Sequence, residues 1–134
     1  MKLAEITNFL ETIAPLNYQE DYDNSGLIVG NHTDDVHAAL IALDCTEQIV
    51  DEAIAKNCNL IITHHPIVFK GLKKFNGKTY VERVVQKAIK NNIALAHLEK
   101  IIKVQKDNKA TVLKGLIISK YGNNMEVYKS IDEA

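Results

Sequence analysis

The chain has 134 residues, of which 46% are hydrophobic and 25% charged, and its formal net charge is −1. Such values are typical of a soluble globular protein and predict a single domain over residues 1–134. The charge balance gives no strong nucleic-acid signal, because a domain that binds nucleic acid usually needs a basic surface to neutralise phosphates. The apolar runs are too short to cross a membrane, and two thiols suggest a reducing compartment, so we expect a cytoplasmic protein.

The first predicted element is an amphipathic helix that Pro15 closes. Its apolar residues recur at helical spacing and lie on one face: Leu3, Ile6, Phe9, Leu10 and Ile13. A polar stretch rich in turn-forming residues follows. It leads into "LIVG" (27–30), an apolar strand candidate between glycines.

From residue 38 onward, strands and helices are expected to alternate. The predicted strands are 38–43, 58–63 and 93–97, and the predicted helices between them are 46–57 and 79–92. Continuous apolar strands separated by helices favour parallel βαβ units with helices on the faces of the sheet. The predicted fold class is therefore α/β with a mostly parallel sheet.

Two helix starts have recognisable signals. Asp44 with Glu47 resembles a helix-start signal, and an aspartate between a strand and a helix usually caps the helix. Thr79 and Glu82 have the spacing of a capping box.

The C-terminal part has a different pattern. Residues 98–112 are lysine-rich and only loosely periodic. The segments "LKGLIISK" (113–120) and "NMEVYKS" (124–130) resemble a pair of strands joined by a turn at "YGNN".

Polar residues follow each of the three predicted parallel strands. Asp44 ends the first, His64 and His65 follow Thr63 at the end of the second, and His97 ends the third. Ligands gather at the carboxyl ends of strands in an open α/β sheet, and parallel strands bring these ends to one edge. Neutral imidazole is a good ligand for Zn, Fe, Ni or Mn ions, so His64, His65 and His97 are candidate metal ligands.

Adjacent histidines can be explained in more than one way. Successive strand residues point to opposite faces, so His64 and His65 serve one centre only if the strand has ended, as Pro66 suggests. Otherwise each serves a different ion of a two-metal site, or both cap the strand end by hydrogen bonding. A lone strand-end histidine such as His97 is often a core residue. Cys45 and Cys58 are best explained as small buried side chains.

Three segments together resemble the Ngg-interacting-factor-three family, whose members are often described as GTP cyclohydrolase I type 2 homologues. They are "DNSGLIVGN" (23–31), "ALDCTEQIVDEAIAKNCNLIITHHPIVFKGLK" (42–73) and "NIALAH" (92–97). The resemblance covers roughly residues 1–97 and leaves 98–134 as a diverged tail, so it implies a partial family fold. It also implies a dinuclear divalent-metal site, assembly into homo-oligomers such as hexamers, and metal-dependent hydrolase or cyclohydrolase activity on nucleotides or related small molecules.

Carried over residue by residue, the resemblance places His64 and His65 among the metal ligands and His97 at the end of the next strand. The family continues from that histidine with Thr-Asn-Leu-Asp, but here Leu98 and Glu99 follow and the aspartate is absent. No histidine occurs after His97, so the family's C-terminal ligand pair is missing. We therefore expect an incomplete metal site, and the alternative is a non-catalytic oligomeric binding or assembly module.

Overall fold

The computed structural model describes residues 1–13, 26–64, 72–97, 109–122 and 125–130, without the side chains of 109–112. Helices and strands alternate along most of the chain. No helix in these ranges is long and apolar enough to cross a membrane. The elements in chain order are α1 (Leu3–Ile13), β1 (Gly26–Val29), β2 (Ala38–Ala42), α2 (Glu47–Ala55), β3 (Leu60–Thr63), α3 (Tyr80–Lys90), β4 (Ala94–His97), α4 (Lys109–Tyr121) and β5 (Glu126–Lys129).

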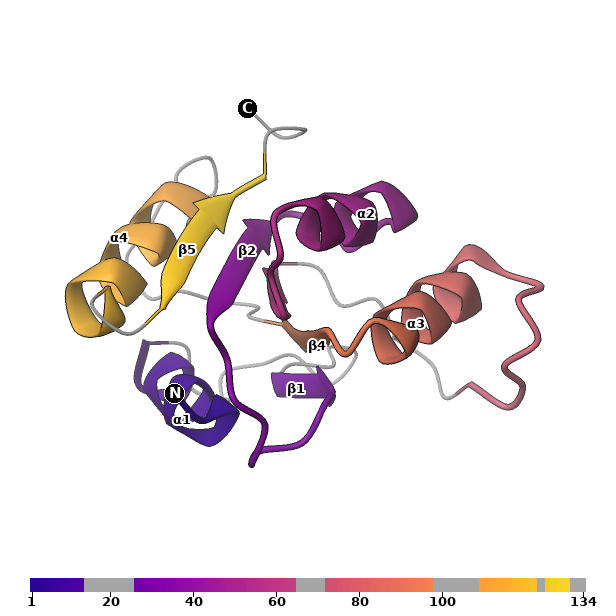
Figure 1. Cartoon of the computed structure of the whole chain (residues 1–134), viewed down its shortest axis with the longest axis horizontal. Helices are drawn as coiled ribbons and strands as arrows, with labels where there is room; N and C mark the ends of the chain where they lie inside the picture. The colour runs from indigo at the N-terminus through magenta and orange to yellow at the C-terminus, as the bar shows by residue number, and fades with distance from the viewer. Residues whose placement is uncertain (14–25, 65–71, 98–108, 123–124, 131–134) are drawn as a thin grey trace.

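The five strands form one sheet in the order β1-β4-β3-β2-β5 (Figure 1). The pairs β4–β3, β3–β2 and β2–β5 are parallel, whereas β1 runs antiparallel to β4 at one edge. The sequence prediction of parallel βαβ units is therefore confirmed for β2, β3 and β4. The strand predicted at "LIVG" is also present, as β1.

Helices cover both faces of the sheet. The side chains of β3 alternate: Leu60 and Ile62 pack with apolar residues of α1 and α4, and Ile61 packs with those of α2 and α3. All residues of β2, β3 and β4 are buried, which explains why these strands are apolar at successive positions rather than at every second one, up to Thr63 and His97 at the ends of β3 and β4.

The two predicted helix starts have different outcomes. At α3 the capping box is present, since Thr79 accepts from the Glu82 backbone and the Glu82 carboxylate accepts from the Thr79 backbone. At α2 the prediction for Asp44 was wrong, because the cap is Thr46, whose hydroxyl accepts from the Ile49 backbone. Thr46 stands three residues before that N–H, which is the spacing that a side-chain cap requires.

The tail also differs from its prediction. Residues 113–120 lie within helix α4, and only 126–129 form a strand, which pairs with β2 and not with a preceding hairpin partner. Leu113 and Ile117 are both buried against the sheet and are four residues apart. This is the spacing of one face of a helix, so the burial pattern agrees with a helix in this segment. The branched residues of "LIIS" were misread as a strand signal.

Candidate functional site

The carboxyl ends of the three central strands meet at one edge of the sheet. Thr63 lies between Ala42 of β2 and His97 of β4 in the register of the parallel ladders. The topology thus brings together strand ends that are far apart in sequence. This edge is the one at which the candidate ligands were expected.

His97 is held in a defined orientation at this edge. The residue is 2% exposed, and its imidazole Nδ1 lies 3.1 Å from the carbonyl oxygen of Thr63. A carbonyl oxygen can only accept, so Nδ1 carries the hydrogen, and in the neutral ring Nε2 then carries the lone pair. A histidine that donates one ring N–H to a backbone carbonyl has the tautomer that a metal ligand needs.

His64 follows directly after the last residue of β3. It is half-buried, and its backbone N–H donates to the carbonyl of Ala42 at 3.3 Å. The regular strand therefore ends at Thr63, before both histidines of the pair. His65, Pro66 and Glu99 lie outside the described residues.

The described donors do not complete a metal shell. Within the described ranges, no group of three or more His, Cys, Asp or Glu side chains is placed to share one ion. Burial, followed by the charge of Asp44, raises the pKa of the Cys45 thiol to about 12, and burial raises the pKa of Cys58 to about 11. Both thiols stay protonated at neutral pH and are poor ligands. Within the described residues of this edge, the imidazoles of His64 and His97 are the side chains that fit a divalent ion.

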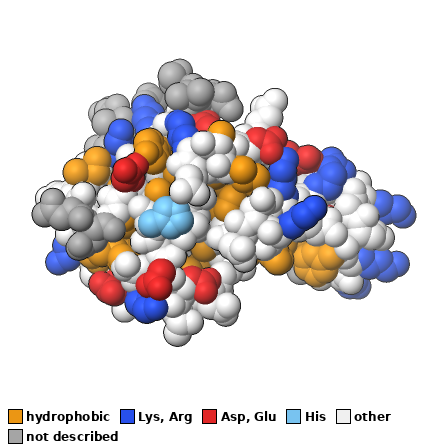
Figure 2. Space-filling view, in the orientation of Figure 1, with side chains coloured by type: hydrophobic (Ala, Val, Ile, Leu, Met, Phe, Trp, Pro, Cys, Tyr) orange, Lys and Arg blue, Asp and Glu red, His pale blue; other side chains and the backbone are white. Residues whose placement is uncertain are grey.

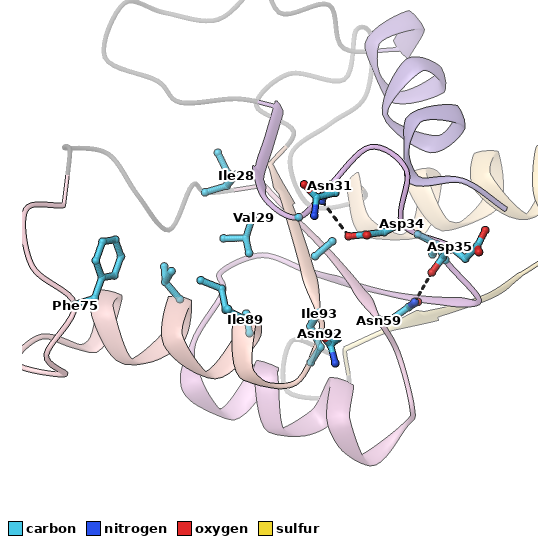
Figure 3. Close-up of a pocket in the computed structure, with 15 residues that line it drawn as sticks. Ile28, Val29, Asn31, Asp34, Asp35, Asn59, Phe75, Ile89, Asn92 and Ile93 are labelled. Carbon is cyan, nitrogen blue, oxygen red and sulfur yellow. Dashed lines mark hydrogen bonds between the residues drawn. The ribbon is translucent and has the colours of Figure 1, made fainter.

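A pocket of about 720 Å³ lies away from the histidines, beside β1 and α3 (Figure 3). It is lined by residues at the end of β1, at the start of β4 and along α3, so it opens toward the amino ends of β3 and β4. Apolar side chains such as Val29 and Ile89 form one wall, and Asn31 and Asp34 lie at its other end. Sequence reasoning missed this pocket because its lining comes from separated segments without a shared motif.

Comparison with known proteins assigns the family. Residues 1–99 match the model of Duf34/NIF3 (NGG1p interacting factor 3). The chain belongs to the Duf34/NIF3 family. It is 47% identical over 93 residues to a GTP cyclohydrolase 1 type 2 homolog of Clostridium acetobutylicum, covering 69% of this chain and 35% of that protein. It is 44% identical over 95 residues to a homolog of the same name from Campylobacter jejuni, covering 71% and 39%.

Solved structures of Duf34/NIF3-like proteins resemble the fold over a longer range. Staphylococcus aureus protein SA1388 matches with a TM-score of 0.72 at 32% identity, covering 91% of this chain and 39% of that one. A Bacillus cereus protein related to NIF3 matches with a TM-score of 0.71 at 33% identity, covering 91% and 33%. Coverage of 91% exceeds what residues 1–99 can supply, so the structural likeness includes part of the tail. The chain nevertheless spans only 26–39% of the length of the curated relatives.

Proposed function

We propose that this Duf34/NIF3 chain binds a divalent metal ion through His64, His65 and His97 and is a hydrolase-like protein with an incomplete dinuclear site. The observation that carries the proposal is the hydrogen bond from His97 Nδ1 to the Thr63 carbonyl, which fixes the ring tautomer beside the end of β3. A buried imidazole with this orientation at the carboxyl edge of a parallel sheet is typical of a ligand site.

The chain's own residues would position the ion. Thr63 holds the hydrogen on His97 Nδ1 and directs Nε2 as the donor atom, while burial of His97 excludes water from its ring. A bound divalent ion would polarise an oxygen of the substrate or lower the pKa of a bound water. Three neutral imidazoles add no negative charge, so we expect weak binding, with Zn, Fe, Mn or Ni as the candidate ions.

The names of the relatives support a class of substrate. Several are GTP cyclohydrolase 1 type 2 homologs, so we infer a nucleotide or a related small molecule as the ligand of the metal edge. Homo-oligomeric assembly, up to a hexamer, and a cytoplasmic location belong to the same proposal. Activity of this chain would require further ligands, because three neutral imidazoles do not offset the charge of two divalent ions.

Metal content tests the proposal directly. Purified protein is incubated with Zn²⁺ or Mn²⁺, desalted and measured by mass spectrometry, alongside His64→Ala/His65→Ala and a His97→Gln variant. We expect metal in the wild type that both variants lose. His32→Ala/His37→Ala removes two exposed imidazoles and serves as the matched control, which should retain the metal. Equal metal in all four proteins would contradict the assignment of the ligands.

A non-catalytic assembly module is the second candidate. It is favoured by the replacement of the family's Thr-Asn-Leu-Asp after the strand-end histidine by Leu98, Glu99, Lys100 and Ile101, which removes an anionic ligand. Light scattering coupled to size-exclusion chromatography distinguishes the two proposals when it is combined with the metal measurement. A stable oligomer without metal, with a melting temperature that Zn²⁺ and chelator leave unchanged, would favour the module, because a ligand of the native state must raise its stability.

A further inference from the structure

The segment that leads into α3 is tied to the start of that helix by hydrogen bonds. Arg83 donates to the carbonyl of Gly77 at 3.0 Å, and the backbone N–H of Asn76 donates to the Glu82 carboxylate at 3.1 Å. Residues 72–79 belong to neither a helix nor a strand, and in Figure 1 they run along the outer end of the molecule beside α3. The segment therefore has a defined course although it has no regular structure.

One peptide group in this segment is not held. It joins Asn76 to Gly77, and within the described ranges its carbonyl accepts no hydrogen bond and its N–H donates none. The preceding peptide group is held at both atoms, since the Phe75 carbonyl accepts from Gln86 Nε2 at 2.7 Å and the Asn76 N–H is bonded to Glu82. The Asn76 carboxamide also has no partner in these ranges, and the residue is exposed. Its side chain is therefore free to turn toward the nitrogen of the next residue.

Gly77 leaves that nitrogen accessible. A β-carbon on the residue after an asparagine obstructs approach of the backbone nitrogen to the carboxamide, and glycine has none. The φ of Gly77 is +77°, in the left-handed region that glycine adopts without strain. Asn76–Gly77 is the only asparagine–glycine pair in the sequence. The one pair with an accessible nitrogen thus coincides with the peptide group that the structure does not hold.

The reaction open to this pair is an intramolecular cyclisation. The Gly77 nitrogen loses its proton and attacks Cγ of Asn76, the new C–N bond closes a succinimide ring, and the side-chain nitrogen leaves as ammonia with that proton. Water then adds to one of the two ring carbonyls. Opening at Cγ gives aspartate, and opening at the backbone carbonyl gives isoaspartate, in which the chain continues through the side chain. The net change is hydrolysis of an amide, so no oxidant or reductant is required.

The charged groups around the pair are mostly cationic. Lys74 and Lys78 flank it in sequence and are exposed, and no ion pair in the described part of the chain includes either of them. In Figure 2, lysine and arginine side chains gather over the end of the molecule that Figure 1 shows to be formed by α3 and the segment before it. Glu82 is the acid of this segment, and its carboxylate already accepts hydrogen bonds from the cap of α3. Positive charge stabilises the nitrogen anion and the oxyanion that form during cyclisation.

We propose that Asn76–Gly77 is a site of spontaneous modification in the folded protein, at which Asn76 is converted through a succinimide to isoaspartate and aspartate, and that this change loosens the start of α3. Either product places a new carboxylate next to Glu82, and the two like charges repel. Isoaspartate also adds a methylene to the main chain between the two held positions, so the hydrogen bond to Glu82 or the one from Arg83 is lost. The isoaspartate form has the free α-carboxylate that an isoaspartate-specific methyltransferase recognises.

Ageing of the purified full chain at mildly alkaline pH tests the proposal. Samples taken over days are digested with pepsin at acid pH and mapped by mass spectrometry, and isoaspartate is counted by methylation with an isoaspartyl methyltransferase and labelled S-adenosylmethionine. We expect the peptide that contains Asn76 to gain one mass unit and to accept label, at a rate of the same order as in a synthetic peptide of residues 72–82. Asn59, whose carboxamide is bonded to the His37 N–H and to the Asp35 carbonyl, is the internal control and should stay unchanged.

Variants connect the modification to α3. Asn76→Gln keeps an amide but closes a ring far more slowly, so it should accept no label, and Asn76→Asp places the carboxylate there from the start. The modified fraction of aged wild type should melt about 3 °C below fresh protein. Asn76→Asp should also melt lower than the wild type, whereas aged Asn76→Gln should melt like its fresh sample. Circular dichroism confirms that each variant is folded.

Four results would overturn the proposal. They are a native chain that reacts more than an order of magnitude more slowly than the peptide, label at other asparagines while Asn76 stays unmodified, equal ageing of Asn76→Gln and wild type, and an unchanged melting temperature in aged protein that carries isoaspartate. Because the pair lies away from the histidine edge, addition of Zn²⁺ or chelator should leave the rate of ageing unchanged, which separates this site from the proposed metal site.

Discussion

The hydroxyl of Ser130 donates a hydrogen bond of 2.8 Å to the carboxylate of Glu52, across 78 residues of sequence. Glu52 also pairs with Lys56 one turn later in α2, and the Lys56 ammonium lies 5.5 Å from the centre of the Tyr128 ring. The end of β5 is therefore joined by polar contacts to a helix of the part that matches the Duf34/NIF3 model.

Ser130→Ala should lower the free energy of unfolding by about 2 kcal/mol, because a buried hydrogen bond to a charged acceptor is lost. Urea denaturation monitored by circular dichroism measures the change. Ser119→Ala, which alters an exposed serine of α4, is the control and should have no measurable effect. Equal stability of the two variants would show that the contact of Ser130 with Glu52 does not hold the tail.

Two neighbouring isoleucines test the helical assignment of the tail. Ile117 is fully buried against the sheet, whereas Ile118 is 45% exposed. Ile117→Ala should therefore cost about 3 kcal/mol of unfolding free energy, and Ile118→Ala well under about 1 kcal/mol. The comparison uses the same substitution at adjacent positions of α4, so equal losses would argue against the packing described.

The capping box of α3 gives a third prediction. Thr79→Ala removes the hydroxyl that accepts from the Glu82 backbone, and should reduce the free energy of unfolding by about 1 kcal/mol. Thr79→Ser keeps the hydroxyl and should restore most of that loss. A serine variant as unstable as the alanine variant would place the effect in the methyl group and not in the cap.

The stability that this cap contributes depends on pH through the carboxylate of Glu82. The Thr79 hydroxyl and then the Asn76 backbone donate to its carboxylate and hold the pKa of Glu82 below its ordinary value of 4.5. A lowered pKa in the folded state gives stability that is present above pH 4.5 and is lost as the pH falls through the folded pKa. Glu82→Gln should therefore show a shallower loss of stability between about pH 5 and about pH 3 than the wild type.

The Cys45 thiol should give stability a pH dependence of the opposite sign, at alkaline pH. Burial raises its pKa from 9.0 to about 12, so its contribution to stability is complete below pH 9 and is lost as the pH rises toward 12. Cys45→Ala should have a flatter stability curve in that range. In the wild type at pH 8, Ellman's reagent should react slowly with Cys45 until urea unfolds the chain, and fast reaction of both cysteines in native protein would contradict its burial.

The central part of the fold was predictable because local and global signals agree there. Strand β2 is apolar throughout, β3 and β4 are apolar up to their last residues, and α3 has both its capping box and a clear helical period. The tail was mispredicted because a branched apolar run such as "LIIS" fits either a strand or a buried helix face. The cap of α2 was misplaced because Asp44 and Thr46 are both good capping residues and only backbone geometry selects between them.

The candidate site was predictable only in part. Parallel topology placed His64 and His97 at neighbouring strand ends, as the register of Thr63 with His97 confirms. The hydrogen bond that orients the His97 ring depends on a backbone carbonyl, which has no sequence signature. The ligand role of His64, His65 and His97 stays a prediction.

The pairing of β5 with β2 has a consequence for the order of folding. Ala39 pairs with Leu60 and, on its other side, with Val127, so the two partners of β2 differ greatly in sequence separation. Closing the longer loop costs more chain entropy, and we expect the inner ladder to form first and the outer one last. Until β5 arrives, the edge of β2 is open to strands of other molecules, which makes that intermediate the species most prone to aggregate.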